Sequence, residues 1–408
     1  MAVQPFKAGP DFIDPSYHNQ FCAGPSRNLD AWLMDKAGVL AEADQHTRAA
    51  TGILEGVMGL FDGASPTSEE GSTMELARWL DWPVVLCMPA AKAGRSIAAT
   101  LRGFLAEAHP NRLAGVVLNG VSGDSHAEYL REAIRPLGVP VLGAIPKNPM
   151  LEWPERHLGL QAAQERLLPS KADLAELARS TLDLESFAAL ARSHPVSSLN
   201  AQVAATRPSS TPSRRIAIAQ DEAFHFYYAA NLEWLAAQDA ELVPFSPLHS
   251  QKLPTDIDAL VIGGGFPEMV AQQLADNATL RAEIRSALNN GLPCYAECGG
   301  LMFLADQMRT ADGTHFPMVG AVPGTIAMTP SLQNFGYCSA EATYHGHEFH
   351  HSLWLAENER ANAWTVTRRR NNRGRREGFR SHALHASYVH LYFPNSAPLL
   401  RAQLGFSS

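Results

Sequence analysis

The stretch Tyr295-Ala-Glu-Cys298-Gly-Gly300-Leu-Met-Phe-Leu304 decides how the second half of the chain folds. An apolar run leads into a cysteine, two glycines follow, and an apolar segment with helical spacing comes next. This order predicts a strand, a sharp turn and a helix, the geometry of the nucleophile elbow that hydrolases form at Gly-x-Ser-x-Gly. Cys298 is therefore expected where a strand ends and a helix begins.

The residues around Cys298 are suited to covalent catalysis. The N-terminus of a helix favours the thiolate, which is the reactive form of cysteine. Because glycine allows a close backbone approach, the amide of Gly299 can point at an oxyanion. Upstream, the turn Gly263-Gly-Gly-Phe-Pro-Glu268 follows an apolar strand, and its Gly264 and Gly265 can supply a second oxyanion donor.

A general base for the thiol is available at His390, in the strand-like run 384–393. A catalytic Cys and its His are usually far apart in sequence and meet only in the fold. A lone cysteine is more often a buried structural thiol. The Cys-Gly-Gly elbow, the preceding Gly-Gly-Gly turn and the late histidine together favour a nucleophile at Cys298.

Both halves of the chain alternate β-rich runs with helical patterns, which predicts parallel α/β sheets. The first half is expected to have strands at 50–55, 83–88, 113–119 and 139–145, and helices at 74–80, 98–108 and 125–137. The second half is expected to have strands at 215–219, 240–245, 259–262 and 293–297, and helices at 226–238 and 274–289. The unbroken apolar runs 83–88 and 113–119 indicate strands that are buried on both faces.

Composition and charge exclude several classes of protein. The chain has 408 residues, which suggests two or three domains, and its 33 basic and 41 acidic residues give a net charge of −8. That charge argues against binding to nucleic acid or to an anionic membrane. No apolar run approaches the ~18 residues of a transmembrane helix, and no signal-peptide pattern is present at the N-terminus. Five cysteines form no disulfide framework, which predicts a reducing cytoplasm.

Two further segments are expected to be exposed. Residues 193–214 are rich in serine, proline and threonine and show little apolar periodicity, which is typical of a linker between domains. The basic cluster 368–376 lies between strand-like runs. In an acidic chain we interpret it as a solvated loop rather than as a nucleic-acid patch.

Several motifs, in this order, resemble those of the cobyrinate (or hydrogenobyrinate) a,c-diamide synthases, whose second half is a class I glutamine amidotransferase domain. In the second half they are Gly-Gly-Gly-Phe-Pro-Glu, Glu-Cys-Gly-Gly-Leu-Met-Phe-Leu, Gly-His-Glu-Phe-His and Ala-Ser-Tyr-Val-His-Leu. The resemblance continues upstream at 4–15, 27–30, 55–63 and 154–160. It implies a synthetase domain similar to dethiobiotin synthetase at 1–192, a linker at 193–214 and the amidotransferase domain at 215–408.

The resemblance implies a ligase of cobalamin biosynthesis that amidates the a and c side-chain carboxylates of a corrin precursor. Its expected substrates are glutamine, ATP and the corrin, with Mg²⁺ as cofactor; the motifs set neither the cobalt content of the corrin nor the oligomeric state. By the same resemblance Cys298 releases ammonia from glutamine and His390 is its base. Class I glutaminases mostly have a glutamate two residues after this histidine, where this chain has Tyr392. The resembled family generally works with a Cys–His pair.

By the same resemblance the first half phosphorylates a carboxylate, and ammonia then displaces the phosphate. This chemistry needs carboxylates for Mg²⁺ and cations or amides for the phosphates. Asp11, Asp14 and Glu55 are the candidates for the phosphoryl site, with Asp11 and Glu55 as Mg²⁺ ligands. Lys7, after an edge-like strand, is expected to meet phosphate, and Asn119 to approach the nucleotide base.

The front of the chain departs from the resemblance. The resembled family opens with a strand, a P-loop ending in Gly-Lys-Thr and a helix, but this sequence contains no Gly-x-x-x-x-Gly-Lys-[Ser/Thr]. The amides and the lysine that would cradle the phosphates of ATP are then missing, together with a central strand. Two interpretations stay open: a start that is assigned too late, or a glutaminase remnant whose synthetase half is inactive.

The sequence His347-Glu-Phe-His-His351 matches His-Glu-x-x-His, the signature of zinc proteases. That motif works on a helix, where residues four apart share one face. Here Gly346 precedes it, and His347, Phe349 and His351 alternate as in a strand, where residues four apart lie ~13 Å apart. A zinc metalloprotease-like hydrolase is therefore the weaker alternative.

Overall fold

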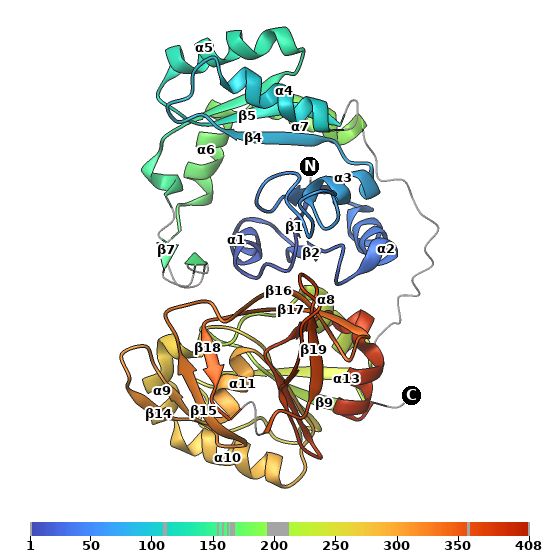
Figure 1. The fold of residues 1–408 in the computed structure, drawn as a ribbon, viewed down its shortest axis with the longest axis vertical. Coiled ribbons are helices and arrows are strands. Elements are labelled where there is room, and N and C mark those ends of the chain that lie inside the picture. Colours follow the sequence, from blue (N-terminus) through green and yellow to red (C-terminus); the bar gives the residue numbers. More distant parts are fainter. Residues whose placement is uncertain are drawn as a thin grey trace. The chain divides into compact units, whose positions relative to one another are not determined.

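The computed structural model describes residues 2–108, 112–152, 155–156, 159–160, 163, 168–193, 212–356 and 360–406. The chain divides into two compact units (Figure 1), the first formed by Met1–Ala31 and Asp35–Gln202 and the second by Trp32–Met34 and Val203–Ser408. The short segment Trp32–Met34 thus belongs to the second unit. Most of the expected linker, from 194 to 211, lies outside the described residues.

The first unit contains two three-stranded parallel sheets, ordered β2-β1-β3 and β4-β5-β6. Parallel α/β pairing is as predicted, but the strands form two sheets rather than one. The elements are β1 (Val3–Ala8), α1 (Ile13–Phe21), β2 (Arg27–Leu29), α2 (Asp35–Thr47), β3 (Thr51–Glu55), α3 (Thr73–Leu80), β4 (Val84–Pro89), α4 (Ile97–Glu107), β5 (Leu113–Val121), α5 (Asp124–Ile134), η1 (Arg135–Leu137), β6 (Val141–Pro146), η2 (Pro149–Leu151), β7 (Glu155–Arg156), β8 (Gly159–Leu160), α6 (Lys171–Thr181) and α7 (Leu184–Ser193).

Two expectations for the first unit are wrong. The strand before Lys7 is not edge-like, because β1 is the central strand of its sheet and pairs with both β2 and β3. The strand expected at 83–88 is not buried on both faces, since Leu86 and Met88 of β4 are buried whereas Cys87 is exposed. β4 is an edge strand, and Leu86 and Met88 pack with α4 and α5 into a core on one face.

The second unit is built on a six-stranded sheet, ordered β10-β9-β11-β12-β22-β21, with a four-stranded sheet β14-β13-β15-β18 and a five-stranded sheet β20-β19-β16-β17-β23. Its elements are β9 (Arg214–Ala219), α8 (Ala229–Ala236), β10 (Ala240–Phe245), β11 (Ala259–Ile262), η4 (Pro267–Val270), α9 (Ala271–Asp276), α10 (Ala278–Asn289), β12 (Cys294–Glu297), α11 (Gly299–Leu304), β13 (Ala305–Arg309), β14 (His315–Pro317), β15 (Val322–Met328), β16 (Asn334–Ala340), β17 (Tyr344–His350), β18 (Ser352–Trp354), β19 (Trp364–Arg368), β20 (Gly374–Glu377), β21 (Phe379–Arg380), β22 (Leu384–Ser387), β23 (His390–Leu391), η5 (Phe393–Ser396) and α13 (Ala397–Leu404).

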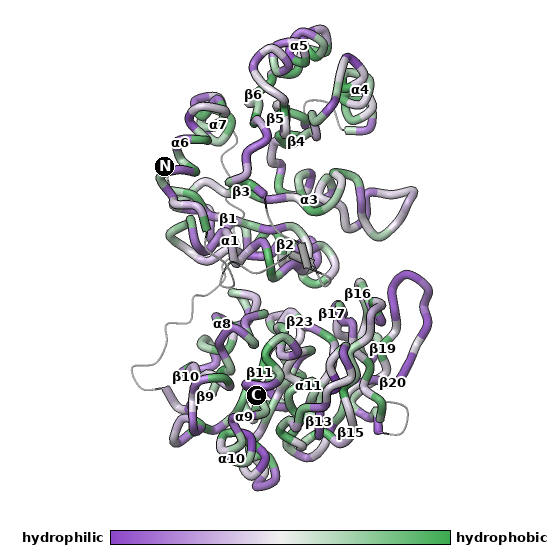
Figure 2. Tube along the Cα trace, turned by 90° about the vertical axis from the view of Figure 1, so that its left-hand side faces the viewer, coloured by the Kyte–Doolittle hydropathy of each residue, from purple (hydrophilic) through white to green (hydrophobic). Residues whose placement is uncertain are grey.

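The central strand β11 is apolar throughout because both of its faces are covered. Leu260 and Ile262 pack into a core with α10 and α11, and Ala259 and Val261 pack into a second core with α8 and α13. Successive side chains of a strand point to opposite faces, so an unbroken apolar run fills both cores. Figure 2 shows β11 as a hydrophobic segment of the trace.

The helix expected at 274–289 is divided into α9 and α10. Asn277 stands between them and caps α10, because its side chain accepts a hydrogen bond from the amide of Leu280 (3.4 Å). The helix expected at 226–238 starts later, at Ala229. Asn and Asp side chains bind nearby backbone amides, so they end helices that apolar periodicity alone would continue.

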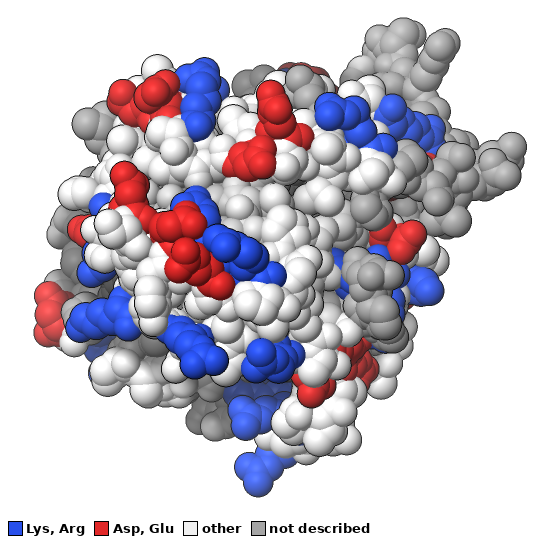
Figure 3. Space-filling model, turned by 90° about the horizontal axis from the view of Figure 1, so that it is seen from above, with Lys and Arg blue, Asp and Glu red and all other residues white. Residues whose placement is uncertain are grey.

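The basic cluster 368–376 spans the turn between β19 and β20, which is strongly hydrophilic in Figure 2. The expected loop is confirmed only in part, because residues 374–376 belong to β20 and the half-buried Arg375 pairs with Glu348. On the face of the molecule drawn in Figure 3, acidic and basic side chains are interspersed. Among the described helices, none is long and apolar enough to cross a membrane.

Candidate active sites

Cys298 lies at a sharp turn between β12 and α11, as the sequence predicts. Its backbone φ of 48° and ψ of −104° are unusual for a residue with a side chain, and strain of this kind occurs at nucleophile elbows. The amide of Cys298 donates a hydrogen bond to the carbonyl of Ser387 (2.7 Å), which fixes the turn to the end of β22. The glycine at position 300 is required, because a Cβ there would lie 2.4 Å from the carbonyl oxygen of Ile262.

His390 lies where the chain passes from one sheet to another. β22 is parallel to β12 in the six-stranded sheet, and β23 then pairs antiparallel with β17, which sets His390 opposite His347. Where the chain passes from β22 to β23, the buried carboxylate of Glu377 accepts hydrogen bonds from Ser387 Oγ (2.5 Å) and from the amide of Tyr388 (2.8 Å). The position of His390 therefore follows from strand pairing on both sides of this crossing.

The structure brings Cys298 and His390 together in a buried site. Only 2% of His390 is exposed, and its ring is hydrogen-bonded to the side chain of Cys298. Burial opposes the charged ring, but the charges of Cys298 and Glu297 raise the pKa of His390 to about 10. A raised pKa keeps the His390 ring protonated beside the thiol, where it can hold and return the proton that a cysteine nucleophile gives up.

The three glycines predicted for an oxyanion hole also meet at this site. A Cβ on Gly264 would lie 2.5 Å from His390 Cε1, and a Cβ on Gly299 would lie 3.1 Å from the amide nitrogen of Gly265. Gly265 has a φ of +153°, and a Cβ on it would lie 1.9 Å from the carbonyl oxygen of Ala223, so a side chain does not fit there.

The His-Glu-x-x-His segment is in a strand, as its alternation predicts. β17 includes His347 and ends at His350, so His347 and His351 do not share a helical face. The described part of the chain contains no group of three or more His, Cys, Asp or Glu side chains that could hold a metal ion. His347 instead stacks on His390, with ring centroids 4.9 Å apart and planes at 11°. The geometry that the zinc alternative needs is therefore not formed.

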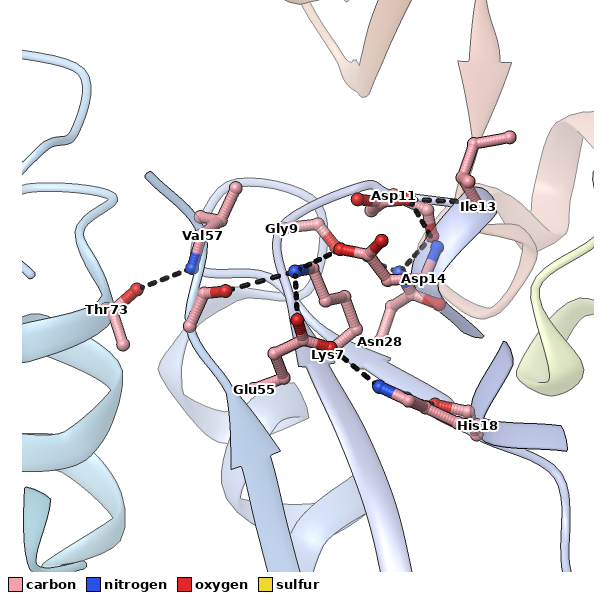
Figure 4. A network of polar contacts seen from close by, with 12 residues as sticks. Lys7, Gly9, Asp11, Ile13, Asp14, His18, Asn28, Glu55, Val57 and Thr73 are labelled. Atoms are coloured by element: carbon pink, nitrogen blue, oxygen red, sulfur yellow. Dashed lines mark hydrogen bonds and ion pairs between the residues drawn. The ribbon is translucent and has the colours of Figure 1, made fainter. Parts of the chain in front are cut away.

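The first unit has a second cluster of charged side chains, centred on Lys7 (Figure 4). Lys7 Nζ lies 2.5 Å from Asp14 Oδ2 and 3.5 Å from Glu55 Oε1, and donates a hydrogen bond to the carbonyl of Gly56 (3.0 Å). Burial lowers the pKa of Lys7, but the neighbouring carboxylates of Asp14 and Glu55 outweigh it and raise the pKa above its usual value. Lys7 is thus a buried cation paired with two carboxylates, on the central strand of its sheet rather than on an edge strand.

Asp11 lies beside this cation. One of its carboxylate oxygens accepts hydrogen bonds from the amides of Ile13 (2.6 Å) and Asp14 (3.2 Å), which fixes the first turn of α1. Burial and the charge of Asp14 raise the pKa of Asp11 to about 6, although Lys7 and these two amides act in the opposite direction. Asn28 donates hydrogen bonds to the carbonyls of Gly9 (2.9 Å) and Asp11 (2.7 Å), and it was not singled out from the sequence.

His18 is a second member of the network that the sequence analysis missed. Its Nε2 lies 2.6 Å from Glu55 Oε2, and its Nδ1 lies 2.8 Å from Ser26 Oγ. Burial raises the pKa of Glu55, but His18 and Lys7 outweigh this and lower it. A histidine at a helix surface gives no sequence signal of its partner, since the partner comes from a different strand. Asn119, by contrast, lies in β5 of the other sheet, where its side chain is exposed.

Comparison with known proteins relates both clusters to one family. A family model described as a CobB/CobQ-like glutamine amidotransferase domain matches residues 215–398, and one described as an AAA domain matches 29–155. The cobyrinate a,c-diamide synthase of Syntrophotalea carbinolica is 40% identical over 427 residues, covering 100% of this chain and 92% of that protein. This chain belongs to the cobyrinate a,c-diamide synthase family.

Two more synthases support this assignment to the cobyrinate a,c-diamide synthase family. The synthase of Priestia megaterium is 39% identical and covers 98% of this chain, which spans 89% of that protein. The synthase of a Synechococcus species is 38% identical, and the match covers 96% of this chain and 89% of that protein. The predicted resemblance is confirmed, and so is the fold class, an AAA-like α/β domain followed by a glutamine amidotransferase domain. The Cys298 cluster lies within the amidotransferase match, and Glu55 within the AAA match.

Proposed function

We propose that this chain uses glutamine and ATP to amidate the a and c side-chain carboxylates of cobyrinate, or of its cobalt-free counterpart hydrogenobyrinate, in the cytoplasm. The observation that carries the proposal is the buried Cys298–His390 pair at a nucleophile elbow, in a chain that matches the synthases over 96–100% of its length. Its substrates are then small molecules, and the charge of −8 gives no reason to expect nucleic acid.

The glutaminase step follows from the chemistry of the pair. The Cys298 thiolate attacks the side-chain carbonyl carbon of glutamine, and His390 holds the proton that the thiol has lost. The oxyanion that forms is stabilised by backbone amides at Gly264, Gly265 and Gly299. His390 then gives its proton to the departing nitrogen, the C–N bond breaks and ammonia leaves. Water, deprotonated by His390, hydrolyses the thioester to glutamate and restores the thiol.

The synthetase step is assigned to the cluster around Lys7. A corrin carboxylate attacks the γ-phosphate of ATP to form an acyl phosphate and ADP, and ammonia then displaces phosphate to form the amide. Lys7, held by Asp14 and Glu55, places a positive charge beside these acids. His18 and the Asp14 ion pair fix the carboxylates of the cluster, so their orientation needs no rearrangement during the reaction.

The acids of this cluster fit Mg²⁺ in part. Asp11 is buried beside Asp14 and its pKa is raised to about 6, so an added cation would relieve the repulsion between these two carboxylates. No group of three or more metal-ligating side chains exists in the described residues. Mg²⁺ commonly binds through one or two carboxylates, with water and substrate phosphates completing its coordination. Asp11 and Glu55 would hold the ion, which would neutralise phosphate charge.

The proposal is tested by assaying the purified chain with cobyrinate, MgATP and either glutamine or ammonium chloride. Mass spectrometry is expected to detect the diamide with both nitrogen donors. Cys298→Ala should lose glutamine-dependent product and glutamine hydrolysis, but keep ammonium-dependent product, because the thiol serves only to liberate ammonia. Glu55→Gln should lose product with either donor and retain glutamine hydrolysis.

Two results would overturn the proposal. One is hydrolysis of glutamine by Cys298→Ala at the parent rate, which would move the nucleophile elsewhere. The other is no amidation of either corrin by the parent chain with ammonium and MgATP, which would make the chain the glutaminase remnant that the missing P-loop motif allows. Running cobyrinate and hydrogenobyrinate side by side also distinguishes the two substrates, since the preferred one should have the higher kcat/KM.

A further inference from the structure

The base His390 needs a group that fixes its ring, and the usual position for such a group is occupied by a tyrosine. Imidazole bases are commonly oriented by a hydrogen-bonding partner on Nδ1, so that Nε2 faces the nucleophile. The residue two positions after His390 is Tyr392, whose ring contacts Tyr228 (centroids 6.5 Å apart). A neutral phenol does not replace the negative charge of a carboxylate.

A carboxylate reaches His390 from another direction. Glu297 immediately precedes the nucleophile, at the end of β12, and only 5% of it is exposed. Its Oε2 lies 3.5 Å from His390 Nδ1. Tyr295 and Glu297 are two residues apart on one strand and therefore share a face, the face toward which β23 and His390 lie. The elbow thus turns Cys298 toward one side of His390 and Glu297 toward the other.

Glu297 is itself held in place by two donors. Its Oε1 accepts a hydrogen bond from Tyr295 Oη (2.8 Å) and another from the amide of Leu391 (3.0 Å), the residue after the base. One carboxylate oxygen is thereby fixed, and the other faces the imidazole. A buried carboxylate is costly unless it is paired and hydrogen-bonded, and the ring of His390 supplies the opposite charge.

Other groups around His390 limit its movement without replacing this carboxylate. His347 of β17 stacks on the ring, and Tyr228 Oη lies 2.7 Å from His347 Nε2. Burial and the charge of His390 hold the pKa of His347 well below its usual range, so His347 packs against the base as an uncharged ring. Gly264 approaches His390 Cε1 from the oxyanion turn. Among the residues that the structure describes, the titratable groups facing the base include Cys298, Glu297 and His347.

We propose that Glu297 is the positioning residue of the glutaminase site, which orients His390 through Nδ1 and keeps its Nε2 directed at Cys298. The inference rests on the proposed glutaminase step and adds to it a role for the residue immediately before the nucleophile. Tyr295 acts one step further away, because it holds the carboxylate. Tyr392, which carries no carboxylate, is the comparison position.

The test compares Glu297→Gln, Tyr295→Phe and Tyr392→Phe with the parent chain. Glutamine hydrolysis is measured from pH 6 to 11, and labelling of Cys298 by 6-diazo-5-oxo-L-norleucine is followed by mass spectrometry. For Glu297→Gln we expect kcat to fall about 10²–10⁴-fold with KM nearly unchanged, the scale of a lost acid–base contribution. The alkaline limb of its pH profile should move to lower pH, because removing the carboxylate lowers the pKa of His390.

The control variants separate positioning from general damage. Tyr295→Phe keeps the carboxylate and removes one hydrogen bond. Its kcat should therefore fall by less than tenfold, and its alkaline limb should move to lower pH by less than in Glu297→Gln. It also provides the test if Glu297→Gln does not fold. Tyr392→Phe keeps the buried ring and removes only its hydroxyl, so its kcat should remain within about twofold of the parent.

The outcomes distinguish this inference from the proposed function. If the parent hydrolyses glutamine and Cys298→Ala does not, while Glu297→Gln and Tyr295→Phe both keep the parent kcat and pH profile, the role of Glu297 is wrong and the nucleophile stands. A large loss in Tyr392→Phe alone would assign orientation to that tyrosine instead. If the parent neither hydrolyses glutamine nor is labelled at Cys298, the glutaminase step itself is wrong, and the role of Glu297 falls with it.

Discussion

At the scale of single residues, burial and charge act against each other around Lys7. Burial penalises every charged form, yet the cation remains because Asp14 and Glu55 lie on either side of it. Asp11 has less compensation, so its carboxyl group is the one whose pKa is raised, to about 6. The folded chain therefore binds a proton on Asp11 more tightly than the unfolded chain does, which links protonation of Asp11 to folding.

The raised pKa of Asp11 predicts a pH-dependent stability. The folded chain holds this proton up to about pH 6, whereas the unfolded chain releases it near the ordinary aspartate pKa of 3.8. The stabilisation is thus fully present below about pH 4 and is lost as the pH rises through 6. In Asp11→Asn the contribution is absent. The free energy of unfolding is measured with urea at pH 4.5 and at pH 7, without divalent cations. The difference between the parent and Asp11→Asn should be smaller at pH 7 by about 1–2 kcal/mol, a figure discounted for the partial exposure of Asp11. A difference that does not change with pH would contradict the assignment.

His18 is expected to act on the synthetase step alone. It fixes Glu55 through Nε2, so His18→Ala should lower ammonium-dependent amidation by about 10–100-fold, the usual effect of losing a group that orients a ligand. Glutamine hydrolysis in the same preparation should be unchanged, because Cys298 lies in the other unit. His18→Asn, which keeps a side-chain donor, should recover part of the loss. Equal losses of both activities would indicate general unfolding instead.

At the scale of elements, the elbow depends on how closely α11 approaches β11. Both are apolar, and the first turn of α11 sits on the carbonyl of Ile262. β11 is a central strand of the six-stranded sheet, so its backbone cannot withdraw without breaking pairing on both sides. The two glycines after Cys298 therefore meet a packing requirement as well as a catalytic one.

This close approach predicts opposite effects for two Gly→Ala changes. Gly300→Ala would set a Cβ 2.4 Å from the backbone oxygen of Ile262 and should lower the free energy of unfolding by about 1–3 kcal/mol, as overpacked core sites do. Gly103→Ala, inside α4 with nothing within 4 Å of the added Cβ, should raise it by about 0.5–1 kcal/mol. Thermal unfolding of the full chain provides the measurement. A neutral Gly300→Ala would mean that α11 can move away from β11.

At the scale of the whole molecule, a short piece of the N-terminal half completes the second unit. Trp32 stacks on His345 with ring centroids 3.9 Å apart, and its Nε1 donates a hydrogen bond to the carbonyl of Cys338 (3.2 Å). The guanidinium of Arg369 lies over the same indole, 4.2 Å from its centroid. These contacts pack Trp32 against β16 and β17, and β17 is the strand that contains His347.

Trp32→Ala is expected to destabilise the second unit selectively, by about 1–3 kcal/mol for a partly buried indole with a cation above it. Hydrogen exchange followed by mass spectrometry should become faster in peptides from β16 and β17 and stay unchanged in β1 and β3. The matched variant is Trp82→Ala, whose indole packs on Phe6 in the first unit (centroids 5.8 Å apart) and should produce the reverse pattern. Faster exchange in both units from Trp32→Ala alone would contradict this division of the contacts.

The sequence by itself determined the local elements and the identity of the reactive groups. Apolar runs of strand length appear as β10 and β11 at the expected residues, and the Cys-Gly-Gly turn after an apolar run appears as the elbow. Periodicity and glycine sterics are local, so they can be read without knowing the fold. Cys298 and His390 could be named because few residue types perform their chemistry. Lys7, Asp11, Asp14 and Glu55 could be named from the family motifs, although their pairing could not.

Only the tertiary structure decided which side chains meet. The carboxylate of Glu297 reaches His390 because the chain leaves the six-stranded sheet after β22 and, after two intervening residues, pairs with β17 through β23. The same crossing stacks His347 on the base, although its motif suggests a metal ligand. Lys7 became buried because β1 is central, and a strand's place in a sheet depends on partners elsewhere in the chain. Such contacts depend on strand order and register, which single-strand patterns do not encode.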